Sequence, residues 1–191
     1  ALTKLGNIST RGSTGAGGAQ LLIAGFVVTG PANRTRQMLI RVVGPGLAAH
    51  GVPAGFLADP RLEVYGPDPT STPLLTNDNW GTQAGGAAAV AAMQQAVART
   101  GAFDLAGADS ADAAVLATLA PGNYTVQARG PEAAASGVVL IEVYDATAVS
   151  SAATPKAINV STRGPVGSGA TAMIAGFVID GAVSRRVLRE R

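Results

Sequence analysis

The chain has one histidine, His50, and no cysteine, which narrows the chemistry its side chains can perform. A Ser-His-Asp hydrolase needs a histidine base beside its nucleophile, and the sequence has no Gly-x-Ser-x-Gly motif. Zinc sites draw on several His and Cys ligands, and iron–sulfur clusters and disulfides need Cys. We therefore interpret His50 as an ordinary loop residue and expect no enzyme activity, no catalytic residues and no cofactor.

Carboxylates in polar segments raise the question of calcium, because this cation prefers oxygen ligands on loops. Asp78 lies between two asparagines, and Asp104, Asp109 and Asp112 follow one another closely. The segment around Asp78 lacks the spacing of an EF-hand loop, and Asp and Asn commonly cap turns through their own side chains. We predict no metal site and keep Asp78, Asp109 and Asp112 as candidates for a calcium site.

The single tryptophan, Trp80, is the candidate for ligand binding. Together with Tyr65 and Tyr124 it could stack on a sugar, which would suit a module that binds surface glycans. Three scattered aromatic residues suit packing in a core or at a corner better than a sugar-binding platform.

Charge and hydropathy argue against two other classes of partner. The 14 Lys and Arg residues are nearly balanced by 12 Asp and Glu residues, and no basic cluster precedes the last seven residues. Nucleic-acid binding requires a basic patch or stripe, so we do not expect it. No run of 18 apolar residues is present, so we expect no membrane span.

A motif that occurs twice organises the rest of the chain. Residues 7–12, NISTRG, return as NVSTRG at 159–164, an offset of 152; residues 22–28, LIAGFVV, return as MIAGFVI at 173–179, an offset of 151. A period of about 150 residues has the size of a domain rather than of a solenoid repeat. We therefore divide the chain into a complete β-sandwich unit at 1–146, a linker at 147–156 and a partial second copy at 157–191. This copy either completes a sheet within the same fold or docks on a neighbouring molecule.

The elements expected between the two copies are mainly strands. Short apolar or alternating runs at 5–10, 21–29, 37–43, 61–65, 74–76, 113–119, 124–129 and 138–144 are separated by Gly- and Pro-rich turns. We expect 21–29 with 37–43, and 113–119 with 124–129, to form hairpin-like pairs. An alanine-rich segment at about 83–99, with Val90, Met93 and Val97 at helical spacing and Gly101 after it, predicts one surface helix. The fold class predicted is all-β, an antiparallel β-sandwich or jelly-roll-like fold with that helix.

Several runs of the sequence resemble the repeated domain of very long secreted or cell-surface proteins of environmental bacteria. They are NISTRG, LIAGFVVTG, LIRVVGPGLAAHGV, LADPRLEVY, NDNWG, FDLAGADSADAAVLATLAPGNYTVQARG and GVVLIEVYD. The resemblance covers residues 5–146 and restarts at Ala157. It implies a non-enzymatic adhesive or structural role at the cell surface or outside the cell, and no catalytic residues.

Two functions follow as expectations. In the first, the chain is a structural subunit of an extracellular bacterial fibre or surface assembly, and its C-terminal copy donates strands to the next molecule, giving a head-to-tail homopolymer. The buried anchors of that subunit interface would be Ile158, Val160, Met173, Ile174, Phe177, Val178 and Ile179. In the second, the chain is a monomeric adhesion or carbohydrate-binding module from a tandem-domain surface protein. An apolar pair of strands left unpaired is an aggregation liability, and this favours the first.

Overall fold

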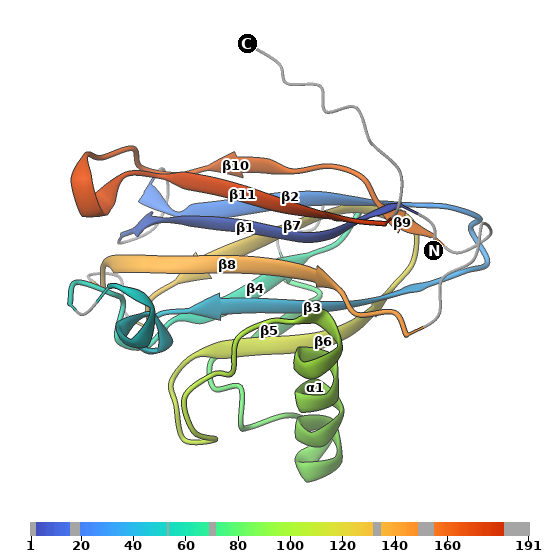
Figure 1. The fold of residues 1–191 in the computed structure, drawn as a ribbon, viewed down its shortest axis with the longest axis horizontal. Helices are drawn as coiled ribbons and strands as arrows, with labels where there is room; N and C mark the ends of the chain where they lie inside the picture. The colour runs from blue at the N-terminus through green and yellow to red at the C-terminus, as the bar shows by residue number, and fades with distance from the viewer. Residues whose placement is uncertain are drawn as a thin grey trace.

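Two antiparallel sheets packed face to face make up the fold (Figure 1). The computed structural model describes residues 3–15, 20–52, 54–68, 72–131, 135–148 and 155–181. The predicted all-β sandwich with one α-helix is confirmed.

The strands fall into two sheets, here called sheet A and sheet B. Sheet A has the order β11-β1-β8-β3-β6, with β1 (Lys4–Thr14), β3 (Arg36–Val43), β6 (Ala113–Leu119), β8 (Gly137–Asp145) and β11 (Ile174–Asp180). Sheet B has the order β10-β2-β7-β4-β5, with β2 (Leu22–Thr29), β4 (Arg61–Tyr65), β5 (Leu75–Asn77), β7 (Gly122–Arg129) and β10 (Ser161–Arg163). The short β9 (Lys156–Ala157) pairs with the end of β2.

The main core lies between the sheets and follows from the alternation of side chains along each strand. In β2 every second residue is buried, and in β7 Tyr124, Val126 and Ala128 point inward in the same way. Leu22, Phe26, Ile40, Leu62 and Ile141 are each at most 2% exposed in this core. In β7 the inward residues are the ones that alternate with Thr125, Gln127 and Arg129 in the sequence.

The expected hairpins are wrong. β2 belongs to sheet B and β3 to sheet A, while β6 belongs to sheet A and β7 to sheet B. The short connections cross from one layer to the other, a distance of about 10 Å, instead of joining hydrogen-bonded neighbours. A Gly- and Pro-rich turn suits either path, and residue alternation alone does not distinguish them.

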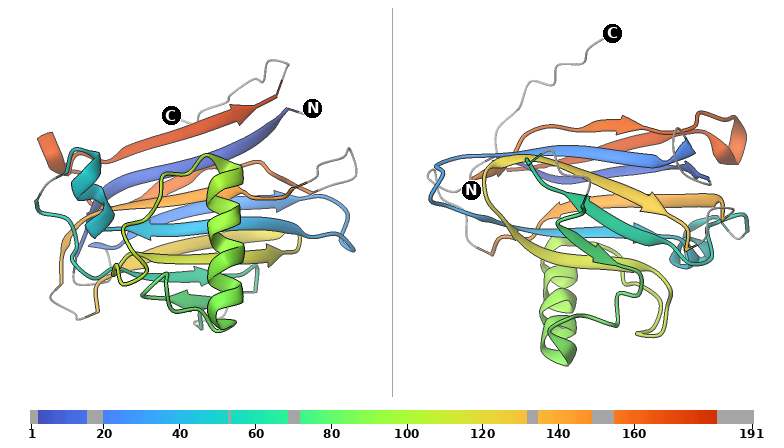
Figure 2. Two further views of the ribbon diagram at one scale, coloured as in Figure 1. Left: turned by 60° about the horizontal axis from the view of Figure 1, so that its bottom comes forward. Right: turned by 180° about the vertical axis from the view of Figure 1, so that it is seen from behind.

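The helix α1 (Gly86–Thr100) lies across the outer face of sheet A (Figure 2). Met93, Ala96 and Val97 are buried against Leu39 and Tyr144, with Val90 packed at the margin. Gly101 follows in the left-handed conformation, φ 69°, which glycine adopts without a steric penalty. The predicted apolar stripe and C-terminal stop are confirmed, and the helix begins three residues later than expected.

Two short 3₁₀ helices complete the described structure: η2 (Pro45–His50) after β3, and η3 (Gly169–Thr171) before β11. The second copy of the motif supplies β10 and β11, which stand at one edge of each sheet beside β2 and β1 (Figure 1).

Candidate functional site: the edge strands of the second copy

The residues considered for catalysis or metal binding do not come together. His50 is exposed at the end of η2, with its ring centroid 4.1 Å from that of Phe103. Asp78 and Asp109 are exposed on separate loops. Among the described residues, no group of three or more His, Asp or Glu side chains is placed to hold a metal ion.

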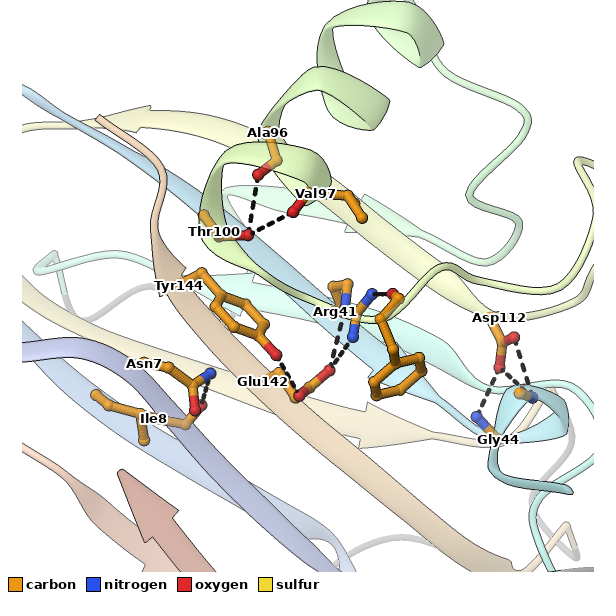
Figure 3. Close-up of polar contacts among 12 residues, drawn as sticks. Asn7, Ile8, Arg41, Gly44, Ala96, Val97, Thr100, Asp112, Glu142 and Tyr144 are labelled. Carbon is orange, nitrogen blue, oxygen red and sulfur yellow. Dashed lines mark hydrogen bonds and ion pairs between the residues drawn. The ribbon is translucent and has the colours of Figure 1, made fainter. Parts of the chain in front are cut away.

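Asp112 accepts several hydrogen bonds that the sequence alone did not indicate. Its fully buried carboxylate accepts hydrogen bonds from the backbone nitrogens of Gly44 (2.8 Å) and Gly46 (3.1 Å) (Figure 3). It also accepts one from the Ser110 hydroxyl (2.8 Å). A buried carboxylate is stable when several donors satisfy it. Asp112 thus anchors the turn that leads from β3 into η2.

Trp80, the candidate for ligand binding, is only 7% exposed and packs in the cluster beneath α1. Its indole nitrogen donates to the carbonyls of Gly107 at 3.0 Å and Ala106 at 3.3 Å. Buried tryptophans usually find such an acceptor. In this position the ring packs against the helix and the loop 102–112 and presents no open face for stacking on a sugar.

A buried ion pair lies on the outer face of sheet A, where β3 and β8 are neighbours. Arg41 and Glu142 are directly opposite each other, and the Arg41 Nε donates to Glu142 Oε2 at 3.0 Å (Figure 3). The same guanidinium donates to the carbonyl of Phe103 at 2.6 Å, and the Tyr144 hydroxyl donates to Glu142 Oε1 at 2.6 Å. The Phe103 ring stacks on the guanidinium, with its centroid 4.3 Å away.

Burial, and then the adjacent Glu142 carboxylate, raise the pKa of Tyr144 above that of a free tyrosine. Every charge in this network has a partner, and Arg41 is fully buried. The cluster therefore fixes the outer face of sheet A rather than presenting a reactive group to solvent.

The seven residues predicted as subunit anchors lie at the edges of the two sheets. Val160 and Met173 are half-buried and pack against the main core. The others are exposed: Ile158 54%, Ile174 49%, Phe177 49%, Val178 55% and Ile179 37%. These five account for most of the exposed large apolar side chains among the described residues, the others being Leu74 and Val166.

The two copies of the motif pair with each other reciprocally. β11 runs antiparallel to β1, with Ser9 opposite Gly176 and Arg11 opposite Ile174. β10 runs antiparallel to β2, with Ser161 opposite Gly25 and Arg163 opposite Ile23. The repeat equates Ser9 with Ser161 and Gly25 with Gly176, so both ladders have the same register. This is the pattern of an isologous two-fold contact, formed here inside one chain.

A pair of equivalent threonines meets between the sheets at the centre of this contact. The hydroxyls of Thr10 and Thr162, 152 residues apart, are 2.8 Å from each other. Thr10 is fully buried, and a buried hydroxyl without a partner is costly. Thr162 satisfies it, so the repetition of this residue has a direct structural reason.

The repeated glycines allow the strands to approach. A Cβ on Gly176 would lie 3.0 Å from the Ser9 hydroxyl, and a Cβ on Gly25 would collide with the Ser161 hydroxyl. The same Ser and Gly positions thus face each other in both ladders.

The sequence analysis identified the repeat and its apolar residues and left open whether the second copy completes the same fold. It did not identify that the two copies pair with each other. The signal was present, since each copy carries the Ser-Thr-Arg and Ile-Ala-Gly segments that face each other across the ladders.

Comparisons with known proteins identify no relative: no family model, no curated protein and no solved structure matches the chain. In the described part of the chain, no helix is both long enough and apolar enough to cross a membrane.

Proposed function

We propose that this chain is a structural, non-enzymatic subunit of an extracellular bacterial fibre or surface assembly. Its C-terminal copy, residues 157–191, joins one molecule to the next head-to-tail by strand complementation. The extracellular setting rests on the resemblance of the sequence to repeats of secreted and cell-surface proteins.

The proposal is supported by one observation at the sheet edges. In the described structure, β11 is an edge strand of sheet A and β10 an edge strand of sheet B, and β11 exposes apolar side chains on both of its faces. Phe177 and Ile179 are exposed on the face that continues the core, and Ile174 and Val178 on the other. An edge strand offers unpaired backbone groups to another strand, and exposed apolar residues add to the affinity of that pairing. Head-to-tail pairing of these edges with strands of the next molecule satisfies both.

The test compares the full chain with variants that block the edge without removing it. Val178→Lys places a charge on an exposed position of β11, which is how natural edge strands avoid pairing. Ala49→Lys is the control, because Ala49 is exposed and lies in η2, which is not an edge strand of either sheet. A chain ending at Ala153 lacks the second copy altogether.

Light scattering and negative-stain electron microscopy should show polymers of the full chain and of the Ala49→Lys variant. Val178→Lys and the shortened chain should remain small. Monomers of the full chain at every concentration would instead favour the monomeric adhesion or carbohydrate-binding module. Polymers that persist in Val178→Lys would also refute assembly through this edge.

A further inference from the structure

On one side, the strands of each copy of the motif pair with the strands of the other copy. On the other side, the two copies have different neighbours. In the first copy, β1 pairs with β8 and β2 pairs with β7 on the sides away from the second copy. In the second copy, β10 takes the role of β1 and β11 the role of β2. Among the described residues, no strand lies on the outer side of either.

Equivalent inward-facing residues are buried in the first copy and exposed in the second, which lacks an outer neighbouring strand in the described part of the chain. Phe26 is 2% exposed because it stacks on Tyr124 of β7, with ring centroids 5.4 Å apart and planes 18° from parallel. Its counterpart Phe177 is 49% exposed. Val28 is 1% exposed, whereas its counterpart Ile179 is 37% exposed.

The composition of β11 suits a paired strand better than a solvent-facing one. Natural edges are protected by Lys, Pro or inward-pointing charges. β11 has the sequence IAGFVID, whose single charged residue, Asp180, is the last in the strand. Nothing in the strand opposes the addition of a neighbour.

The strands that fill the equivalent places in this sandwich are not free to fill them again. β7 already pairs with β2 and β4, and β8 already pairs with β1 and β3. The strands that cover β10 and β11 must therefore come from another sandwich, one in which these places are open.

We infer that the outer edges of β11 and β10 accept a β7-type and a β8-type strand of a second sandwich of this kind, which uses residues 157–180 as its own first two strands. Sheet A of one unit then continues through β11 into sheet B of the next, and sheet B continues through β10 into the next sheet A. The Thr10–Thr162 contact lies at the centre of the joint, and the two units face each other about an approximate two-fold axis.

The register follows from the first copy. Phe26 is opposite Tyr124 and Ala24 is opposite Val126 in the β2–β7 ladder. Phe177 should therefore face the Tyr124 equivalent of the second unit, and Ala175 the Val126 equivalent. Ile8 is opposite Val143 in the β1–β8 ladder, so Val160 should face the Val143 equivalent.

The inference rests on the proposed function in one respect, that the second copy joins this sandwich to a neighbour, but its test is independent of polymer formation. The sequence at 185–188, RRVL, echoes RQML at 36–39. Residues 1–188 followed directly by residues 40–148 therefore form a chain in which the second copy is completed. Because the protein has no cysteine, a single introduced thiol is a specific probe in both the natural and the extended chain.

The first measurement is the rate at which a thiol reagent labels Phe177→Cys. We expect labelling to slow by at least about tenfold in the extended chain relative to chain 1–191, because a paired strand must open before it reacts. Leu74→Cys in the first unit is the control and should react equally fast in both chains. Tryptophan fluorescence and circular dichroism report whether the appended residues fold with a second helix.

The second measurement tests the register. Oxidation of the extended chain should link Phe177→Cys to Tyr124→Cys of the appended copy, since opposite residues in an antiparallel ladder are close enough for a disulfide. Phe177→Cys with Ala128→Cys of the appended copy is the matched mispaired control and should not link.

Equal labelling of Phe177→Cys in the two chains would overturn the inference, as would a link to Ala128→Cys. Failure of the appended residues to fold would also overturn it, because the inference states that residues 157–180 supply the strands they need. Disulfide-linked pairs of Phe177→Cys chains in both forms would point instead to an edge that pairs with itself. If chain 1–191 stays monomeric while the extended chain forms the disulfide between Phe177→Cys and Tyr124→Cys of the appended copy, the proposed self-assembly fails and this inference stands.

Discussion

Phe26 and Phe177 have the same neighbours in sequence and opposite environments in the structure. The first lies in a closed core against Tyr124, and the second is half exposed at the end of sheet A. The two copies share the contact that joins them, with the same register in both ladders. The whole difference lies on the far side of each strand, where β7 and β8 flank the first copy only.

This difference shows that the motif forms strands for local reasons and becomes buried for tertiary ones. The short apolar run Leu-Ile-Ala-Gly-Phe-Val-Val contains β-branched and aromatic residues, which suit a strand wherever the run occurs. The stability gained from it depends on the second neighbour, which the described part of this chain provides once and not twice.

The largest expected effect comes from truncating the two equivalent phenylalanines. Phe26→Ala should lower the free energy of unfolding by about 3–5 kcal/mol, because it removes a buried ring and leaves a cavity. Phe177→Ala should lower it by about 1 kcal/mol or less, because half of that ring is already in water. Urea unfolding of both variants measures the contrast. Equal losses would mean that the second copy is buried in solution, for instance in a polymer, and a dilution series would then separate the two cases.

The flanking strand β8 is the second place to test the contrast, through its buried charge. Glu142→Ala leaves the fully buried Arg41 guanidinium without its carboxylate, which costs about 3–5 kcal/mol. Glu63→Ala is the control, because the partners of Glu63, Arg61 and Arg129, are 47% and 36% exposed and can be hydrated when the carboxylate is removed. Its loss of stability should be the smaller one. Thermal or urea unfolding should separate the two variants clearly. If Glu142→Ala lowers the free energy of unfolding only slightly, water must reach the Arg41 guanidinium in the folded protein.

High pH should lower the free energy of unfolding through Tyr144, which lies in the same strand, β8. Burial raises the pKa of Tyr144, so the folded protein holds this proton more tightly than the unfolded chain does. The stabilisation is therefore complete below the pKa of an unfolded tyrosine, about 10, and is lost as the pH rises further. Unfolding curves of the natural protein should show this alkaline loss, and Tyr144→Phe should reduce it. An unchanged slope in Tyr144→Phe would assign the alkaline loss to other groups.

Much of this architecture was predictable from local patterns, and the reasons for the exceptions are physical. The inward residues of β7, the helix and its stop at Gly101 follow from alternation, helical spacing and glycine conformation. The layer to which each strand belongs did not follow, because a short turn between β2 and β3 serves either a hairpin or a crossing between sheets.

The buried charges were a signal that sequence reasoning did not use. Arg41 and Glu142 each stand inside an apolar run of their strand, and a buried charge is tolerated only with a partner. Taken together they predict that β3 and β8 are neighbours, as the structure shows. The pairing of the two copies is harder to predict, since it depends on which edges remain open after the sandwich has closed.

The smallest expected effect concerns the threonines at the centre of the contact. Thr162→Val removes the only side-chain partner found for the Thr10 hydroxyl among the described residues, and Thr10 is fully buried. Thr10→Val leaves the Thr162 hydroxyl, which is half-buried and closer to water. Because the penalty for an unsatisfied hydroxyl, about 1–3 kcal/mol, grows with its burial, Thr162→Val should destabilise more than Thr10→Val.

The double variant decides whether the hydroxyls act as a pair. Replacing both with valine removes donor and acceptor together, so the loss should be smaller than the sum of the two single losses. Urea unfolding of the natural protein, the two single variants and the double variant gives the four free energies of this double-mutant cycle. Additive losses would indicate that each threonine acts through separate packing, and the equivalence of the two copies at their contact would then rest on the backbone ladders and the paired glycines alone.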